Sequence, residues 1–255
     1  MGAVVCRVVD VAGSLSVVLV PGAPVLVPEL AGAAAHECAD DLARLLDLLG
    51  AAARDARPVR VWGHDPAGRS CGDGPGTLRR WGADVLVGPH LDGAGNGEGG
   101  GAGDELPDAA LLAWWFLDRV GCTAPRRFDP VDVDGRSPLA SDAAPTTPGE
   151  LVLVVADGPA SLSPRAPVPL DERGVALDAA LAGWLRCGGE LPDPGAGVAA
   201  AVGWWSRPAW LHLAALLGSA RDGLAPPATA HHSFAPFGVG YHCARWDLPR
   251  PGSAS

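Results

Sequence analysis

The chain has 255 residues, 48% of them hydrophobic, so it can bury a large core in one domain or in two closely joined halves. Its 29 acidic and 19 basic side chains give a net charge of −10, which argues against partners that are nucleic acids or anionic membranes. No stretch approaches the roughly 20 apolar residues that a membrane-spanning helix needs, and the first residues lack the pattern of a secretory signal.

The cysteines are widely scattered and form no Cys-x-x-Cys pair, which argues against zinc knuckles and thioredoxin-type redox sites. A chain of this length does not need disulfides to close its core, so free thiols in a reducing compartment fit best. We therefore expect a cytoplasmic protein. The six cysteines are Cys6, Cys38, Cys71, Cys122, Cys187 and Cys243.

Short apolar runs alternate along the chain with longer segments of helical period, which is typical of an α/β protein whose mostly buried central sheet is flanked by helices. The predicted strands are residues 16–20, 59–62, 83–87, 151–156 and 239–246, with residues 4–11 as a candidate hairpin partner of the first. The predicted helices are residues 33–54, 107–120, 172–186 and 208–217. We predict a single α/β domain over residues 1–248.

Two segments interrupt this pattern and are predicted to be flexible insertions. Residues 92–104 are mostly glycine, and residues 128–149 are rich in Pro, Asp, Ser and Thr. Neither composition buries enough apolar surface to offset the entropy cost of ordering the chain. The tail at 249–255 is predicted to be disordered.

Three strand ends carry motifs in a fixed order. The first predicted strand is followed by Pro21-Gly-Ala-Pro, an apolar triplet and Pro28-Glu29. The second ends in Gly-His64-Asp65-Pro, and the strand at 151–156 is followed by Asp-Gly and then by Leu-Ser163-Pro164. Together these motifs resemble those of the iron-binding chain of the class III extradiol ring-cleavage dioxygenases, over roughly residues 16–246.

The resemblance implies an extradiol dioxygenase-like fold with a cleft formed by the loops after the three strands. In this sequence the implied cleft residues are Gly22, His64, Asp65, Asp157 and Ser163. The family binds Fe(II) through two histidines and one carboxylate, a site with open positions for substrate and O2. His64 falls on one histidine position and is the metal ligand that the resemblance implies.

The other histidine positions of the family are lost. Gly22 stands at the first ligand position, and Pro164 stands where the family has its acid–base histidine, so no catalytic residue is assigned. Loss of such a proton-transfer group typically slows a reaction 10²- to 10⁴-fold. We therefore predict a catalytically degenerate member without a cofactor, which retains a small-molecule cleft or takes part in subunit assembly as a homo- or hetero-oligomer.

The alternative is an active Fe(II)-dependent dioxygenase that acts on an aromatic diol with a rearranged ligand set. Convergence of the candidate side chains in the fold would favour this alternative, and their dispersal would favour the degenerate protein. The candidate ligands are His64, Asp65, Asp157, His231, His232 and His242.

Several of these residues also have plain structural interpretations. His64 fits any polar turn after a buried strand, and Asp65 before a proline is typical of an Asx turn. Residues 63–70 match a phosphate-binding loop except for Arg in place of Lys, but the glycines that follow cannot begin the helix that such a loop requires. The pairs Trp114-Trp115 and Trp204-Trp205 are expected in the core, the outward member of each marking a subunit interface.

Overall fold

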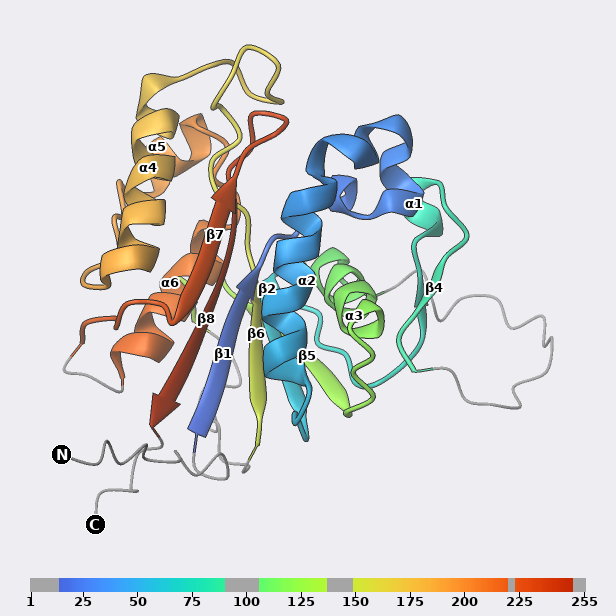
Figure 1. Ribbon diagram of the computed structural model, residues 1–255. Coiled ribbons are helices and arrows are strands. Elements are labelled where there is room, and N and C mark those ends of the chain that lie inside the picture. Colours follow the sequence, from blue (N-terminus) through green and yellow to red (C-terminus); the bar gives the residue numbers. More distant parts are fainter. Residues whose placement is uncertain (1–13, 90–105, 137–148, 220–222, 250–255) are drawn as a thin grey trace, which may run out of the picture.

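A computed structural model describes residues 14–89, 106–136, 149–219 and 223–249 (Figure 1). It shows a mixed α/β protein with a six-stranded central sheet of order β5-β2-β6-β1-β8-β7, flanked by helices, as predicted at this level. The strands of the sheet are β1 (Ser14–Val20), β2 (Val59–His64), β5 (Arg126–Val131), β6 (Leu151–Val155), β7 (Ala230–Phe234) and β8 (Tyr241–Pro249).

The centre of the sheet is parallel. Strand β6 pairs in parallel with both β1 and β2, and β5 continues the parallel set beyond β2. Strand β8 pairs antiparallel with β1, and β7 closes the antiparallel end of the sheet against β8. All five residues of β6 are apolar and buried, because a central parallel strand is covered on both faces.

Helices cover the two faces of the sheet. Helices α2 (Ala39–Ala53) and α3 (Asp108–Arg119) lie on one face, and α4 (Glu172–Cys187) and α6 (Arg207–Gly218) lie on the other (Figure 1). Side chains alternate along β6, so Leu153 joins the first core and Val154 joins the second. One strand therefore supplies both cores.

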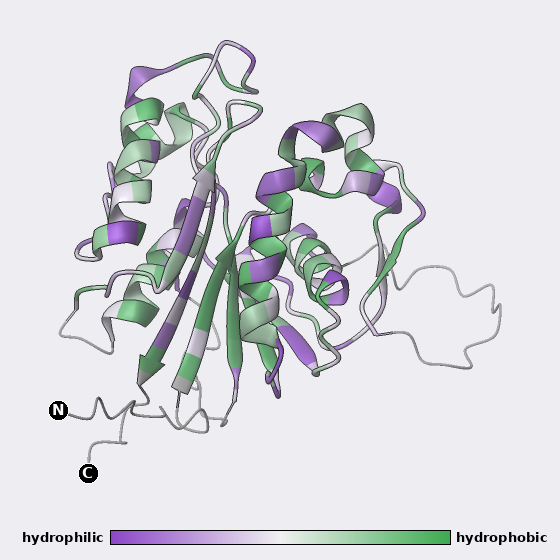
Figure 2. Cartoon of the chain, in the orientation of Figure 1, coloured by the Kyte–Doolittle hydropathy of each residue, from purple (hydrophilic) through white to green (hydrophobic). Residues whose placement is uncertain are grey.

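Figure 2 shows the central strands in hydrophobic colours, whereas α2 alternates between hydrophobic and hydrophilic residues. In α2 the buried side chains include Leu42, Leu45 and Leu49, which recur at spacings of three and four. This spacing places one apolar stripe of the helix against the sheet. The helix N-terminus carries Asp40 and Asp41, whose negative charge suits the positive end of the helix dipole.

The remaining elements are short. The segment between β1 and α2 contains η2 (Pro24–Leu26), α1 (Pro28–Ala31) and η3 (Gly32–Cys38). The segment between β2 and α3 contains β3 (Gly76–Thr77), η4 (Arg79–Trp81) and β4 (Leu86–Val87). Helix α5 (Ala196–Ala201) lies between α4 and α6.

Several predicted boundaries are wrong. Residues 83–87 do not form a core strand: only Leu86–Val87 is extended, as β4, and it pairs with β3 outside the central sheet. Leu86 is exposed, whereas Val87 is fully buried in the first core, so this run reaches the core from outside the central sheet. The helix predicted from residue 33 begins as the 3-10 helix η3, and the α-helix starts at Ala39.

The sheet also contains strands that the sequence patterns did not indicate. The prediction of a flexible insertion at 128–149 is wrong for its first residues, which belong to β5. Residues 137–148 lie outside the described part of the chain. Strand β7 was not predicted, and β8 runs from Tyr241 through the first residue of the predicted tail. The segments at 4–11, 92–104 and 250–255 lie outside the described residues.

The exposure of the paired tryptophans differs from the prediction. Trp114, Trp115 and Trp204 are all buried, whereas Trp205 is 62% exposed. An outward tryptophan is therefore found in the second pair alone, and its role in an interface stays a prediction. In the part of the chain that the structure describes, no helix has the length and apolar character needed to cross a membrane.

Candidate functional site

The four parallel strands β1, β2, β5 and β6 end at the same edge of the sheet, which we call the carboxyl edge. From β1 the chain passes through α2 to β2, which lies beyond β6. From β6 it passes through α4 and α6 on the opposite face to β7, which lies beyond β1. The connections thus leave two neighbouring strands in opposite directions, and such a switch point is where open α/β sheets bind their ligands.

Gly22 and Asp157 meet at this switch point. Gly22 follows β1 and Asp157 follows β6, and the Gly22 N–H donates a hydrogen bond of 2.8 Å to Asp157 Oδ1. A Cβ atom at Gly22 would lie 3.1 Å from Val155 Cγ1 and 3.5 Å from Asp157 Oδ2. A side chain at this position would therefore crowd Val155, and glycine lets the backbone after β1 approach the Asp157 carboxylate closely.

Asp157 titrates near neutral pH. Burial disfavours its charged form and raises its pKa to about 7, although the hydrogen bond from Gly22 acts in the opposite direction. The Trp210 indole Nε1 donates to the backbone carbonyl of Asp157 at 2.9 Å, which fixes the loop. Burial, together with the nearby Asp157 carboxylate, raises the pKa of the Tyr241 hydroxyl. Asp157 is thus able to hold or release a proton at physiological pH.

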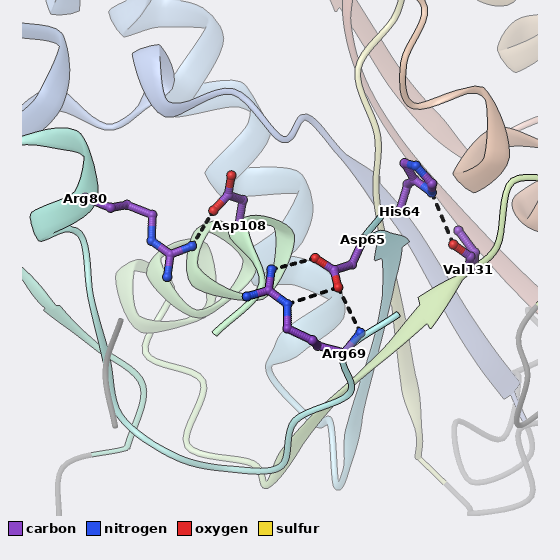
Figure 3. A network of polar contacts seen from close by, with 6 residues as sticks. All are labelled: His64, Asp65, Arg69, Arg80, Asp108 and Val131. Atoms are coloured by element: carbon purple, nitrogen blue, oxygen red, sulfur yellow. Dashed lines mark hydrogen bonds and ion pairs between the residues drawn. The ribbon is translucent and has the colours of Figure 1, made fainter. Parts of the chain in front are cut away.

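His64 is the last residue of β2 and is half-buried at the carboxyl edge. Its Nδ1 lies 3.2 Å from the carbonyl oxygen of Val131, the last residue of the neighbouring strand β5 (Figure 3). When Nδ1 donates to this carbonyl, Nε2 is the nitrogen left to accept a hydrogen bond or to bind a metal. The histidine therefore offers one ligand atom.

Asp65 is used by the turn that follows β2. Its buried carboxylate accepts hydrogen bonds from Arg69, from the backbone N at 2.8 Å and from Nη2 at 2.7 Å (Figure 3). Burial alone would raise the pKa of Asp65, but the hydrogen bonds from Arg69 outweigh it and lower the pKa. No helix directly follows residues 63–70, as predicted, and Gly76–Thr77 forms β3 instead, so this loop does not have the phosphate-binding structure.

The loop after β6 is tied to the loop before β8. Leu162 N donates to the Gly238 carbonyl at 2.9 Å, and a Cβ atom at Gly238 would lie 2.3 Å from Ser163 Oγ. Pro164 is exposed. The structure therefore joins Gly22 to Asp157 directly, and it packs Ser163 against the Gly238 loop.

The other candidate metal ligands have separate partners. His232 Nε2 lies 2.6 Å from Asp41 Oδ1 on α2, and His231 is exposed on β7. His242 is fully buried and lies between Ser233 and Asp178. Among the described residues, no three His, Cys, Asp or Glu side chains are placed to hold one metal ion. These residues do not fit the iron site that the resemblance implies, and we derive no step through iron.

Three residues near the site were missed by the sequence analysis: Asp178, Trp210 and Tyr241. Trp210 falls in the predicted helix 208–217, and it lies in the core with its indole N–H donating to the Asp157 carbonyl. Tyr241 is the single tyrosine of the chain, and it follows Gly238 and Gly240. Asp178 lies mid-helix in a segment whose spacing signalled only an apolar stripe.

A separate pocket of about 530 Å³ lies away from these residues. It is lined by residues of the second half of α2 and of the turn after it, between Leu46 and Ala56, and by the segment Arg119–Ala124. None of the predicted cleft residues lines it. The candidate site at the carboxyl edge is therefore identified by its polar groups and by its position at the switch point of the sheet, and not by this pocket.

Comparison with models of known protein families finds no match for the chain, and comparison with curated proteins also finds none. The functional argument therefore depends on the residues at the carboxyl edge.

Proposed function

We propose that the chain is a catalytically degenerate relative of the extradiol ring-cleavage dioxygenases that binds a small aromatic diol at the carboxyl edge without cleaving it. The observation that supports this most strongly is the contact between Gly22 and Asp157 at the switch point of the sheet. It combines a carboxyl group of raised pKa with a backbone amide that holds one of its oxygens.

Asp157 is the anchor of this proposed site. Its Oδ1 accepts a hydrogen bond from the Gly22 amide, so Oδ2 is the oxygen proposed to contact the ligand. An ionised carboxylate accepts a hydrogen bond from a ligand hydroxyl, and a protonated one donates to a phenolate. Because the pKa of Asp157 is about 7, both forms are available near neutral pH.

Ring cleavage is not expected, because the imidazoles that the resemblance implies are missing. Gly22 and Pro164 supply neither a metal ligand nor a proton-transfer group. His64 contributes one nitrogen, since its other nitrogen lies against the Val131 carbonyl. A single imidazole beside a carboxylate is a weaker metal site than the two-histidine, one-carboxylate set.

The direct test is titration of the protein with catechol under anaerobic conditions, with binding measured by tryptophan fluorescence and by calorimetry. We expect binding that weakens at least 10-fold in Asp157→Asn and is unchanged in Asp84→Asn, an exposed aspartate remote in sequence from the site. Phenol and benzene should bind more weakly than the diol. Equal affinity in wild type and Asp157→Asn, or no binding of catechol, would overturn the proposal.

Iron is measured in the same preparations. Protein purified without tags or chelators under anaerobic conditions is compared with His64→Ala for Fe(II) content and affinity. We expect neither protein to hold stoichiometric iron. Stoichiometric Fe(II) that is lost in His64→Ala, together with O2 consumption on addition of catechol, would establish the alternative, an active dioxygenase.

A further inference from the structure

Ser233, His242 and Asp178 form a hydrogen-bonded chain on the α4 side of the sheet. Ser233 Oγ lies 2.8 Å from His242 Nδ1, and His242 Nε2 lies 3.0 Å from Asp178 Oδ1. The serine is on β7, the histidine is opposite it on β8, and the aspartate is on α4. A hydroxyl, an imidazole and a carboxylate in this order are the elements of an activated nucleophile.

The hydrogen bonds define the direction of proton transfer. An ionised carboxylate only accepts, so the proton between Asp178 and a neutral His242 belongs to Nε2. Nδ1 is then the acceptor, and the Ser233 hydroxyl donates to it. The imidazole is therefore oriented as a general base toward Ser233.

The surroundings hold this chain in place. His242 is fully buried, and the Trp210 ring packs against it edge-on at 5.5 Å. A Cβ atom at Gly240 would lie 1.9 Å from Asp178 Oδ1, so only glycine leaves room for the carboxylate there. Gly158 is similarly close, because its Cβ would lie 3.2 Å from both Asp178 Oδ1 and His242 Nε2.

Ser233 is the end of the hydrogen-bonded chain that lies at the margin of the sheet. It is half-buried, unlike His242, and it lies on β7, which is the outermost strand of the sheet (Figure 1). The residues on either side of it along the chain are partly or fully exposed, including His231 and Ala235. Ser233 therefore lies at the margin of the sheet, next to partly exposed residues.

We propose that Ser233 is the nucleophile of an acyl-transfer site for small carboxylic esters, with His242 as its general base and Asp178 as a positioning residue. Ser233 Oγ attacks the ester carbonyl while its proton passes to His242 Nδ1. His242 then returns this proton to the departing alkoxide, which leaves as the alcohol, and the acyl group stays on Ser233. Water, deprotonated by the same nitrogen, attacks the acyl-serine, releases the carboxylic acid and restores the hydroxyl.

The first experiment is the reaction of the intact wild-type protein with a fluorophosphonate probe, followed by peptide mass spectrometry. This mapping does not depend on the folding of any variant. We expect one phosphonylated residue, Ser233. An unmodified protein, or modification at other residues alone, would overturn the proposal.

The second experiment is hydrolysis of p-nitrophenyl acetate. We expect at least a 100-fold loss of rate in Ser233→Ala and His242→Gln, and no change in Ser16→Ala, which removes a half-buried serine whose hydroxyl contacts Asp247 without an imidazole. In Asp178→Asn, kcat should fall while KM is unchanged, because Asp178 acts through His242. Undiminished hydrolysis by a Ser233→Ala protein that has the circular dichroism of the wild type would contradict the proposal.

Discussion

Asp157 makes the stability of the protein depend on pH. Its pKa rises from an ordinary value of 3.8 to about 7 on folding, so the folded protein binds this proton more tightly than the unfolded chain. Below about pH 4, Asp157 does not lower the free energy of unfolding. As the pH rises to about 7, its ionisation lowers this free energy progressively. Because one pKa unit corresponds to about 1.4 kcal/mol, the full loss of unfolding free energy is about 4 kcal/mol.

Asp157→Asn removes this titration and keeps an oxygen for the Gly22 amide. We expect the stability of the variant relative to wild type to increase by about 2–3 kcal/mol between pH 5 and pH 8 in urea unfolding. In Asp84→Asn, which changes an exposed carboxylate, the difference from wild type should vary much less over this range. A constant difference between Asp157→Asn and wild type would show that Asp157 is ionised in the folded protein at pH 5.

Gly240 is predicted to tolerate no side chain. Gly240→Ala brings a methyl group 1.9 Å from Asp178 Oδ1, a contact that the structure relieves only by moving α4 or the loop. We expect a loss of about 1–3 kcal/mol, typical of overpacking, measured by urea unfolding. Gly197→Ala is the matched control, because that glycine lies in α5 with open space around it, and alanine should raise stability by about 0.5–1 kcal/mol.

Residue-scale features of the site were predictable where they depend on strand ends. Gly22, His64 and Asp157 each lie at the end of a buried apolar run, and parallel strands bring their carboxyl ends to one edge. The hydrogen-bonded chain of Ser233 and His242 was not predictable. It depends on the register of β7 against β8. The sequence of β7 alternates too little between apolar and polar residues for this strand to be predicted.

Arg126 attaches the edge strand β5 to helix α3. Its guanidinium is buried and donates to Asp118 Oδ1 at 2.7 Å and to the Cys122 carbonyl at 2.6 Å. Asp118 in turn accepts from the Gly88 amide at 2.7 Å, which anchors the segment after β4. One ion pair therefore joins three elements.

Removing this arginine should be among the most destabilising changes in the chain. Arg126→Ala leaves a cavity, an unpaired Asp118 and a bare carbonyl, for an expected loss of about 3–5 kcal/mol in urea unfolding. Arg136→Ala removes a highly exposed partner of Asp134 and should change stability by less than about 1 kcal/mol. Similar losses in both variants would mean that Arg126 contributes no more than a surface charge.

At the scale of elements, the strands that could be predicted from the sequence are those buried on both faces of the sheet. Strand β6 is a continuous apolar run and was predicted almost to the residue. Strand β5 was missed because it begins with two arginines and contains Pro130, and its place is decided by the contact of Arg126 with α3. Conversely, residues 83–87 have strand-like composition, but only Leu86–Val87 forms a strand, β4, which ends before Gly88 with its positive φ angle.

At the scale of the whole molecule, the described residues form two cores that share one sheet. The core under α2 and α3 and the core under α4 and α6 meet across the strands, and β6 supplies residues to both. Because both cores pack on the same strands, loosening either one disturbs the support of the other. We therefore expect the single domain predicted over residues 1–248 to unfold as one cooperative unit.

Two substitutions in adjacent residues of β6 test this cooperativity. Leu153→Ala opens a cavity on the α2 and α3 side and should cost about 2–5 kcal/mol, and Val154→Ala does so on the α4 and α6 side with a smaller loss. In each variant, tryptophan fluorescence and far-ultraviolet circular dichroism should give one coincident urea transition, moved to lower denaturant. Two separate transitions, with each substitution moving only one of them, would show that the chain consists of two independently folding halves.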